Sequence, residues 1–402
     1  MTASIRHVAI RNFKSLGSVS VPLQRLTVLV GPNGSGKSNF VQALAFVQEG
    51  LAKSIDVAFT TRGGVGAVRR RSGGHPWHIG VRLGLDLGDG ARADYAFEIA
   101  AKPKERFRVS HERCIVQRPL QERFEFEIRD GIFEVPIPGI RPRVEPDRFA
   151  LYAASATEEF RPVYDFLSRM RFYSIAPDRV REQQEADPGE VLKPDGGNAA
   201  AVLKRLRDQD PEGYDRVCRL LARAVEGVER VEYALAGDKE TLRFRQDIGL
   251  KHPWDFPAIS MSDGTLRLLG LLLAVYQSGL ASVVAIEEPE ATVHPAIAEL
   301  VLQVLRDAAS ERQIVITTHS PDLLDSTGLR DEEILAVTKE RGTTLIAPLA
   351  PAARQAIRER LYTPGELLRD NELTPDLDAA RREADQLDLF GRPASEPIEV
   401  AD

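Results

Sequence analysis

The sequence predicts an α/β fold with a largely parallel sheet, and two stretches of the chain support this prediction. In the first, an apolar strand at residues 26–30 runs through a glycine-rich turn into a helix that begins at Lys37. In the second, helix, strand, helix and strand alternate at residues 262–277, 282–287, 295–309 and 313–318. Helices that alternate with short apolar strands are typical of a parallel sheet covered on both faces.

The glycine-rich turn fits the spacing G-x-x-x-x-G-K-[ST] at Gly31, Gly36, Lys37 and Ser38. Glycines let backbone N–H groups curl around phosphate oxygens, and the following helix N-terminus adds its positive dipole end. A turn that merely joins strand to helix is the alternative, but the strand–loop–helix context favours a phosphate loop of the P-loop NTPase kind. The expected ligands are ATP and Mg²⁺. The expected nucleotide contacts in this stretch are Gly31, Asn33, Gly34, Ser35, Gly36, Lys37, Ser38 and Asn39.

Composition and charge narrow the class of protein. The net charge is −7, but the segment 371–402 contains nine acidic and three basic residues, so the rest of the chain is nearly neutral and basic patches on it could bind phosphate backbones. Two cysteines, Cys114 and Cys218, form no metal-like cluster. The N-terminus lacks the apolar core of a signal peptide, and the most apolar run, residues 268–275, is too short to span a bilayer. We therefore expect a cytoplasmic protein with no membrane role.

Between the two α/β stretches the pattern changes. Residues 77–135 alternate apolar and polar side chains with turns at Asp89-Gly90 and Asp130-Gly131, which predicts an antiparallel β subdomain. Residues 155–230 are expected to form a helical lobe, with helices at 160–171, 198–208 and 211–225, and a strand pair at 228–235 and 242–246 follows. The aromatic residues from Tyr95 to Phe133 are read as sheet core rather than as platforms for stacked bases.

Two acidic residues, Glu287 and Glu288, end the strand at 282–287. At the carboxyl end of a parallel strand, Glu287 could support Mg²⁺ and Glu288 could polarise an attacking water. Solvated loop acids are the alternative. His319 ends the next apolar strand and could bind a γ-phosphate or the attacking water, although an isolated histidine at this position would be an ordinary loop residue.

These residues together resemble the ABC-type ATPase heads. The motifs stand in the family's order: the phosphate loop, Ser260-Met261-Ser262-Asp263-Gly264-Thr265, Ile286-Glu287-Glu288-Pro289-Glu290 with His294-Pro295, and Thr318-His319-Ser320. The opening Ile10-Arg11-Asn12-Phe13-Lys14-Ser15-Leu16 resembles the branch that holds the chromosome-maintenance (SMC), Rad50-like and RecF-like ATPases. Asp195-Gly196-Gly197-Asn198 and Tyr362-Thr363-Pro364-Gly365-Glu366-Leu367 resemble bacterial AAA ATPases related to the overcoming-lysogenisation-defect nucleases.

The resemblance covers about residues 1–370 and implies roles for individual residues. It makes Glu288 the catalytic carboxylate and His319 the switch histidine, and it assigns phosphate and magnesium to Lys37 and Ser38. Ser262 and Gly264 would form the signature that closes on the ATP of an opposite subunit in a dimer with two sandwiched ATPs. The departures are Met261, Asp263 and Thr265 in the signature, and Glu287 where many relatives have aspartate, so that its metal contact could be indirect. The lid-loop glutamine has no assigned position.

The leading functional hypothesis is an ATPase whose ATP-driven dimerisation acts on DNA or on a DNA-associated partner, in repair or phage defence. The alternative is a regulatory ATP-sensing subunit that controls a separately encoded effector, and a transporter subunit is third. A fused topoisomerase-primase nuclease domain is not expected, because little chain follows residue 351. A weaker candidate for phosphate contacts is Arg62 with Arg69, Arg70 and Arg71, for which a solvated face is the alternative.

Residues 371–402 are expected to form a flexible acidic tail. Within it, Gln386-Leu387-Asp388-Leu389-Phe390 closely resembles the peptide with which bacterial polymerases and repair proteins dock on the sliding clamp. In that role Gln386 would hydrogen-bond at the edge of the pocket while Leu387, Leu389 and Phe390 fill it. The alternatives are a C-terminal staple that folds back onto the head and a chance match.

Overall fold

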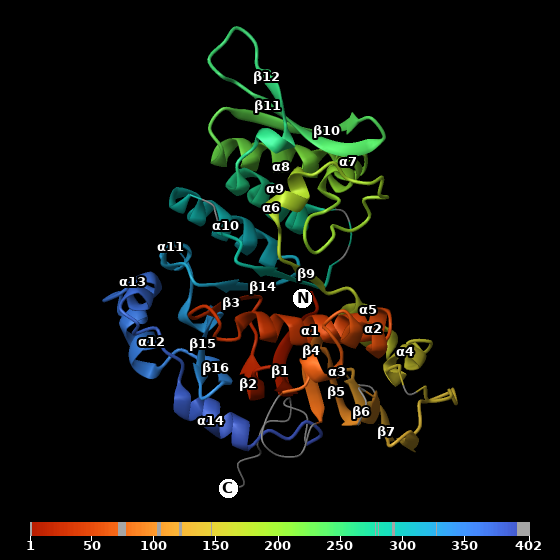
Figure 1. The fold of residues 1–402 in the computed structure, drawn as a ribbon. Coiled ribbons are helices and arrows are strands. Elements are labelled where there is room, and N and C mark those ends of the chain that lie inside the picture. Colours follow the sequence, from red (N-terminus) through yellow and green to blue (C-terminus); the bar gives the residue numbers. More distant parts are fainter. Residues whose placement is uncertain are drawn as a thin grey trace. The chain divides into compact units, whose positions relative to one another are not determined.

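The computed structural model describes residues 2–70, 78–102, 106–119, 123–145, 147–277, 279, 281–291, 294–326 and 328–391. The chain divides into two compact units (Figure 1). Unit 1 comprises residues 1–170, 330–362 and 370–402, and unit 2 comprises residues 171–329 and 363–369. Each unit therefore contains segments that are far apart in the sequence.

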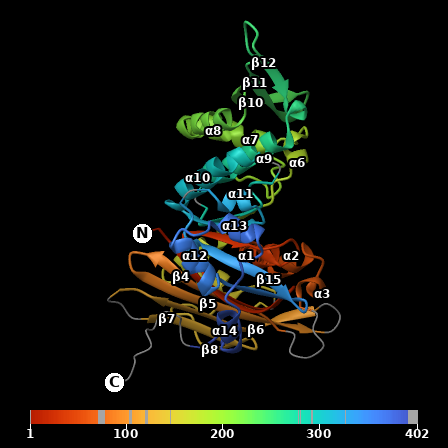
Figure 2. The ribbon, with the colours of Figure 1, turned by 90° about the vertical axis from the view of Figure 1, so that its left-hand side faces the viewer.

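Unit 1 is built on a long sheet in the order β8-β7-β6-β5-β4-β1-β2-β16-β15-β3. Its strands are β1 Ser4–Phe13, β2 Leu16–Pro22, β3 Leu26–Val30, β4 Ile79–Gly88, β5 Ala91–Lys102, β6 Arg106–Gln117, β7 Arg123–Arg129, β8 Ile132–Val135, β15 Ile334–Glu340 and β16 Thr343–Pro348. Its helices are α1 Lys37–Ala52, α2 Ile55–Thr60, α3 Val65–Val68, α4 Ala150–Ala154, α5 Arg161–Ser168, η3 Asp331–Glu333, α12 Pro351–Arg358 and α14 Leu377–Asp385. Strands β4 to β8 pair antiparallel, as the alternating pattern predicts (Figure 2). Strand β15 pairs parallel with β3.

The antiparallel part of this sheet has one apolar and one polar face. Val81 lies opposite Phe97, and Leu83 lies opposite Tyr95, and all four side chains are fully buried. Phe149, just before α4, packs its ring 4.4 Å from that of Phe97. The interpretation of these aromatics as core is therefore confirmed for the residues named. Both aspartate–glycine turns have positive φ at both positions, which suits the hairpin twist.

Unit 2 contains a short parallel sheet in the order β14-β13-β9 and a three-stranded antiparallel sheet in the order β10-β11-β12. Its elements are β9 Arg171–Tyr173, α6 Pro177–Arg181, α7 Ala199–Gln209, α8 Pro211–Ala224, β10 Val228–Ala236, β11 Lys239–Gln246, β12 Trp254–Pro257, η1 Ala258–Ser260, α9 Asp263–Tyr276, β13 Val283–Glu287, η2 Pro295–Ile297, α10 Ala298–Ala309, β14 Gln313–Thr318, α11 Pro321–Leu324 and α13 Pro364–Arg369. Helices α7 and α8 cover β10 (Figure 1). The predicted start of α8 is confirmed, because the Asp210 side chain accepts a hydrogen bond from the Gly213 N–H and Pro211 occupies the first turn.

Helix α5 does not belong to the helical lobe that was expected at residues 155–230. This helix belongs to unit 1, where Val163 and Leu167 are fully buried. The Gln48 side chain on α1 donates to the Ser168 carbonyl at 3.1 Å. The apolar face of α5 thus completes the core around α1, and the division between the units falls after residue 170.

The structure also corrects the expectation of a flexible tail for the part of 371–402 that it describes. Residues 377–385 form α14, whose N-cap Asp376 accepts from the Ala379 N–H. Leu389 is only 1 % exposed. The segment folds back onto unit 1, as the staple alternative anticipated, because burying Leu389 removes apolar surface from water. Residues 392–402 of the expected tail lie outside the described residues.

Candidate active site

The glycine-rich turn of unit 1 is held in a shape that only glycine allows at two positions. A Cβ at Gly31 would lie 2.1 Å from the Val337 carbonyl oxygen on β15, and one at Gly36 would lie 2.1 Å from Thr344 Oγ1 on β16. Gly36 also has a φ of 110°. By contrast, Gly34 at the exposed tip has no atom within 4 Å of a Cβ position. The turn is packed tightly on its inner side and open on its outer side.

A chain of hydrogen bonds supports this turn from distant parts of the sequence. Asn39 Nδ2 donates to Ser15 Oγ at 2.7 Å, and Ser15 Oγ lies 2.6 Å from Thr344 Oγ1. Thr344 Oγ1 donates to the Ser35 carbonyl at 2.7 Å. Since Thr344 has one proton and gives it to Ser35, Ser15 is the donor to Thr344. The motif around Ser15 therefore acts by supporting the phosphate loop. Sequence analysis missed Thr344, which no local pattern marks.

The side chains of the turn fit a polyphosphate anion. Lys37 is 5 % exposed, and its Nζ donates to the carbonyls of Gly31 at 2.7 Å and Pro32 at 3.1 Å, which keeps the cation beside the loop. The buried Ser35 Oγ has no hydrogen-bond partner among the described residues. Helix α1 starts at Lys37 with no acidic residue in its first turn, so its positive end is uncompensated. Ser38, the predicted magnesium ligand, is half-buried in this turn.

In unit 2, strands β13 and β14 run parallel with Glu287 opposite Thr317, so their carboxyl ends meet. Glu288 follows β13 with a φ of 45°, and its N–H donates to the Thr317 carbonyl at 2.9 Å. The Nδ1 atom of His319 lies 3.1 Å from Glu288 Oε1, and the two side chains are 44 % and 36 % exposed. The structure thus brings together Glu287, Glu288 and His319 at one edge of this sheet, with the last two in contact and accessible.

Behind this pair lies a buried carboxyl group that sequence analysis named only as part of a motif. Glu290 is 8 % exposed, and burial raises the pKa of its carboxyl. Thr318 Oγ1 donates to Glu290 Oε1, while Oε2 has no hydrogen-bond partner among the described residues. The same Thr318 oxygen accepts from the Ser320 N–H at 2.9 Å. Glu290 therefore helps to position the backbone on both sides of His319.

The signature-like segment forms the start of α9. Ser262 is the N-cap, and its Oγ accepts from the Thr265 N–H at 3.2 Å. Ser262 is exposed and Gly264 is half-exposed. Two of the departures from the usual signature have structural reasons, because Met261 is 8 % exposed in the core and Thr265 Oγ1 lies 2.9 Å from Ser262 Oγ. Asp263 pairs with Arg181.

Comparison with known proteins decides the family. Residues 26–325 match the family described as "AAA domain, putative AbiEii toxin, Type IV TA system". The chain belongs to this AAA-domain family. The match covers the phosphate loop, the signature-like segment, the acidic end of β13 and the end of β14 that precedes His319, so these motifs belong to one AAA domain.

Two solved structures share the fold of this AAA-domain protein. One is an Smc head bound to the C-winged helix domain of ScpA, with 15 % identity, a TM-score of 0.52, and coverage of 88 % of this chain and 99 % of the other. The second is an Smc head with an extended coiled coil, bound to the C-terminal domain of ScpA, derived from Pyrococcus furiosus. It has 14 % identity, a TM-score of 0.52, and coverage of 90 % and 100 %. At this identity the likeness shows the fold alone, which is that of an SMC-head P-loop ATPase, as predicted.

The predicted metal ligands Ser38 and Glu287 belong to different units of this AAA-domain protein. Within the described ranges, no group of three or more His, Cys, Asp and Glu side chains is arranged to hold a metal ion. The coordination of Mg²⁺ by Ser38 and Glu287 therefore stays a prediction. Over the same ranges, no helix is long and apolar enough to cross a membrane.

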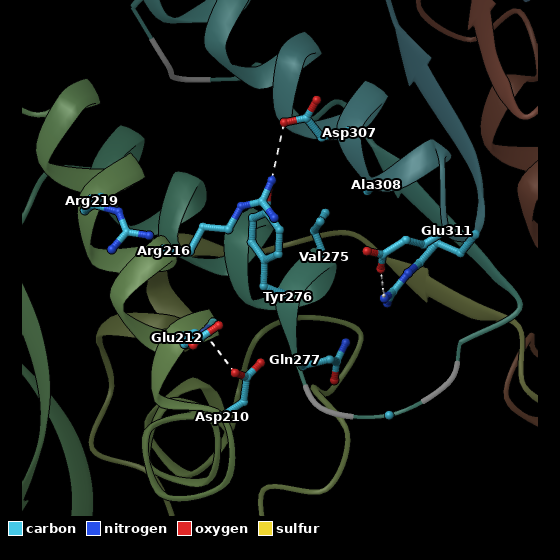
Figure 3. A pocket seen from close by; sticks show the side chains of 13 residues that line it. Asp210, Glu212, Arg216, Arg219, Val275, Tyr276, Gln277, Asp307, Ala308 and Glu311 are labelled. Carbon is cyan, nitrogen blue, oxygen red and sulfur yellow. Dashed lines mark hydrogen bonds and ion pairs between the residues drawn. The ribbon is translucent and has the colours of Figure 1, made fainter.

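A pocket of about 460 Å³ in unit 2 lies apart from all predicted site residues (Figure 3). It is lined by α8, by the end of α9 and by the end of α10. Arg216 on α8 pairs with Asp307 on α10 at 3.4 Å and lies 4.6 Å from the centre of the Tyr276 ring on α9. These contacts join the three helices, and we interpret the pocket as a polar layer between them.

The arginines proposed for nucleic-acid phosphates have structural partners. Arg62 pairs with Glu49 at 2.5 Å. Arg70 Nη2 donates to Thr343 Oγ1 at 2.6 Å, and its guanidinium fills the space beside Gly17. Arg71 lies outside the described residues. Arg62 and Arg70 thus stabilise unit 1, which neither of the two sequence interpretations anticipated.

Proposed function

We propose that this protein is an ATPase that binds ATP with Mg²⁺, hydrolyses it to ADP and phosphate, and uses the cycle to form and separate a homodimer. The observation that carries hydrolysis is the contact between Glu288 and His319 at the ends of neighbouring strands. A phosphate loop alone would bind nucleotide, whereas an accessible carboxylate held beside an imidazole can polarise water.

The residues take separate roles in this proposal. Lys37 and the N–H groups of the loop bind the β- and γ-phosphates, and the rigid inner side of the loop keeps them in place without reorganisation. Ser38 and Glu287 would hold Mg²⁺ directly or through water, and the ion would supply positive charge beside the phosphates. Glu288 accepts a proton from the attacking water. His319, held through Nδ1, can donate from Nε2 to a phosphate oxygen when protonated.

Dimerisation rests on the start of α9. Ser262 is exposed at the N-terminus of a 14-residue helix, where N–H groups and the dipole favour an anion. We propose that Ser262 and Gly264 close on the γ-phosphate held by a second copy. The unusual Asp263 is compatible with this role because Arg181 offsets its charge.

The wider role proposed is action on DNA or on a DNA-associated partner, in the cytoplasm. Supporting it are the family description, which names a type IV toxin–antitoxin system, and the fold shared with Smc heads that were solved with ScpA domains. Docking of residues 386–390 on a sliding clamp stays a prediction, and it requires release of Leu389 from the sheet, where this side chain is buried.

Phosphate release measured with Mg²⁺ and ATP, alone and with duplex or single-stranded DNA, tests the proposal. Stimulation by DNA supports direct action on DNA, while slow turnover without DNA binding at low salt favours the regulatory subunit. Lys53→Ala is a matched control for Lys37→Ala, because Lys53 is exposed at the other end of α1. No turnover by the unmodified chain, or equal losses in both variants, would reject the ATPase assignment.

A further inference from the structure

The polar face of the sheet in unit 1 binds the main chain of the C-terminal segment 387–391, here called the strap. Three arginines on different strands reach it. Arg11 on β1 donates to the Leu387 carbonyl at 2.5 Å, and Arg82 on β4 donates to the Asp388 carbonyl at 3.0 Å. Arg113 on β6 donates to the Phe390 carbonyl at 2.6 Å and the Gly391 carbonyl at 3.0 Å. Four of the five consecutive carbonyls are bound by guanidinium groups, as in a site that recognises the main chain of a peptide.

Two side chains of the strap fit features of the same face. Leu389 is buried above Gly80 of β4, where a Cβ would lie 2.1 Å from Leu389 Cδ1. The Phe390 ring stacks on the His111 ring of β6, with centroids 3.4 Å apart and planes 14° apart. A missing side chain at Gly80 therefore forms a slot for leucine, and an imidazole forms a flat seat for phenylalanine.

The groove is held in shape by contacts that do not involve the strap. Arg82 Nε pairs with Asp94 at 2.9 Å, and the two side chains are 9 % and 6 % exposed. His111 Nε2 lies 2.5 Å from Glu127 Oε1 on β7. Because these partners come from the sheet itself, the Arg82 donor and the His111 ring are preorganised for a peptide.

The strap is attached to unit 1 as a ligand would be. Leu389 is its one fully buried side chain, and in the preceding α14 only Ala380 is buried. Two further contacts of α14 are polar and exposed, namely Ser20 with Glu383 at 2.9 Å and Arg381 with Glu340 at 3.4 Å. Removing the strap would therefore leave the sheet's apolar core on the opposite face intact.

We propose that this face is a peptide-binding groove that exchanges its own strap for the strap of a second copy of the chain. The strap of a second copy has the same sequence, so it can accept the same hydrogen bonds from the three arginines and place its leucine over Gly80. Exchange between copies therefore loses few interactions. A segment attached to the same chain has a high effective concentration, which favours the closed form until copies are close together. This association is separate from the proposed ATP-dependent dimer, because it uses neither the phosphate loop nor α9.

Two complementary full-length variants test the exchange. Leu389→Ser with Phe390→Ser removes the strap's anchors and leaves the groove, while Gly80→Val fills the slot and leaves the strap. Valine suits a strand, and the nearest atom to its Cβ other than Leu389 is the Phe97 carbonyl oxygen at 3.6 Å. Both variants also carry Lys37→Ala, which excludes nucleotide-dependent dimers. We expect each variant alone to be monomeric and an equimolar mixture at about 100 μM to form a 1:1 complex, measured by light scattering.

A labelled synthetic peptide of residues 384–391 tests the groove itself. It should bind the strap variant at least tenfold more tightly than the unmodified chain, whose groove is filled, and Gly80→Val should bind none. The same peptide with both anchors changed to alanine is the control. Circular dichroism and thermal melting confirm that each variant folds. No peptide binding by the folded strap variant overturns the groove, and peptide binding without a mixed complex overturns the exchange between copies.

Discussion

The proposed chemistry has a binding half, the phosphate loop of unit 1, and an acidic half, the ends of β13 and β14 in unit 2, and the structure holds the two differently. The phosphate loop packs against strands β15 and β16. Gly31 and Gly36 lie so close to these strands that no side chain fits at either position. The acidic half exposes its two chemical groups, with Glu288 and His319 touching each other at 3.1 Å and each more than one-third exposed. The proposed binding groups of unit 1 are therefore preformed, whereas the proposed hydrolytic groups of unit 2 are accessible to water.

The largest effect expected is on turnover. Glu288→Gln keeps the shape of the side chain and loses the charge that polarises water, so the rate of phosphate release should fall by about 10²–10³-fold. ATP affinity, measured by calorimetry, should change less than about threefold, because the loop does not depend on Glu288. Glu311→Gln, an exposed site on unit 2, is the control. A parallel loss of affinity would show that the two halves are not functionally distinct.

The same substitution should trap the proposed dimer. With ATP and Mg²⁺, Glu288→Gln is expected to double its mass in light scattering, and adding Ser262→Arg should restore the monomer through charge and bulk. A monomer under saturating ATP would contradict the sandwich arrangement.

For the binding half, Lys37→Ala should weaken ATP binding by about 100-fold, because charge-assisted hydrogen bonds to phosphate are lost. Titration of a fluorescent ATP analogue measures this loss, with Lys53→Ala unchanged. If Lys37→Ala binds ATP normally, the preformed loop is not the nucleotide site.

A smaller effect tests the long-range support of the loop. Thr344→Val keeps the volume of the side chain but removes the hydroxyl that donates to Ser35 and accepts from Ser15. We expect ATP affinity to fall about fivefold to tenfold, equivalent to about 1 kcal/mol. Thr338→Val on the adjacent strand β15 is the control. Equal effects of the two variants would show that the Thr344 hydroxyl does not support the phosphate loop.

The last expected effect concerns the pH dependence of folding stability rather than nucleotide binding or turnover. Glu112 in unit 1 is fully buried, and burial raises its pKa to about 7 although it accepts hydrogen bonds from the N–H groups of Ala150 and Leu151. The folded state therefore binds this proton more tightly than the unfolded state, whose carboxyl has a pKa near 4.5. The contribution of Glu112 to the free energy of unfolding should be complete below about pH 4.5 and should fall by about 3 kcal/mol as pH rises to about 7.

Urea unfolding at pH 5 and pH 8 measures this decline, which Glu112→Gln should reduce. Burial also raises the pKa of Glu290 in unit 2, so its carboxyl has the same sign of effect. Glu290→Gln should also reduce the decline, and a decline that both variants leave unchanged would contradict the assignment to these buried carboxyls.

The local elements of this protein could be predicted from its amino-acid sequence. The phosphate loop, the acidic end of β13 and the aspartate–glycine turns could be predicted, because glycine sterics, strand apolarity and turn preferences act within a few residues. The roles of Lys37, Glu288 and Ser262 are implied by the resemblance of those motifs, in their order along the chain, to the ABC-type ATPase heads, and they stay predictions.

The contacts that support these local elements were visible only in the tertiary structure. Thr344 lies 309 residues from Ser35, and the strap meets Arg11 from 376 residues away. Such contacts depend on which strands become neighbours and in what register, which no local pattern encodes. The acidic composition predicted a flexible tail. Instead, Leu389 is buried, and three arginines that are distant in the sequence bind the carbonyls of the strap.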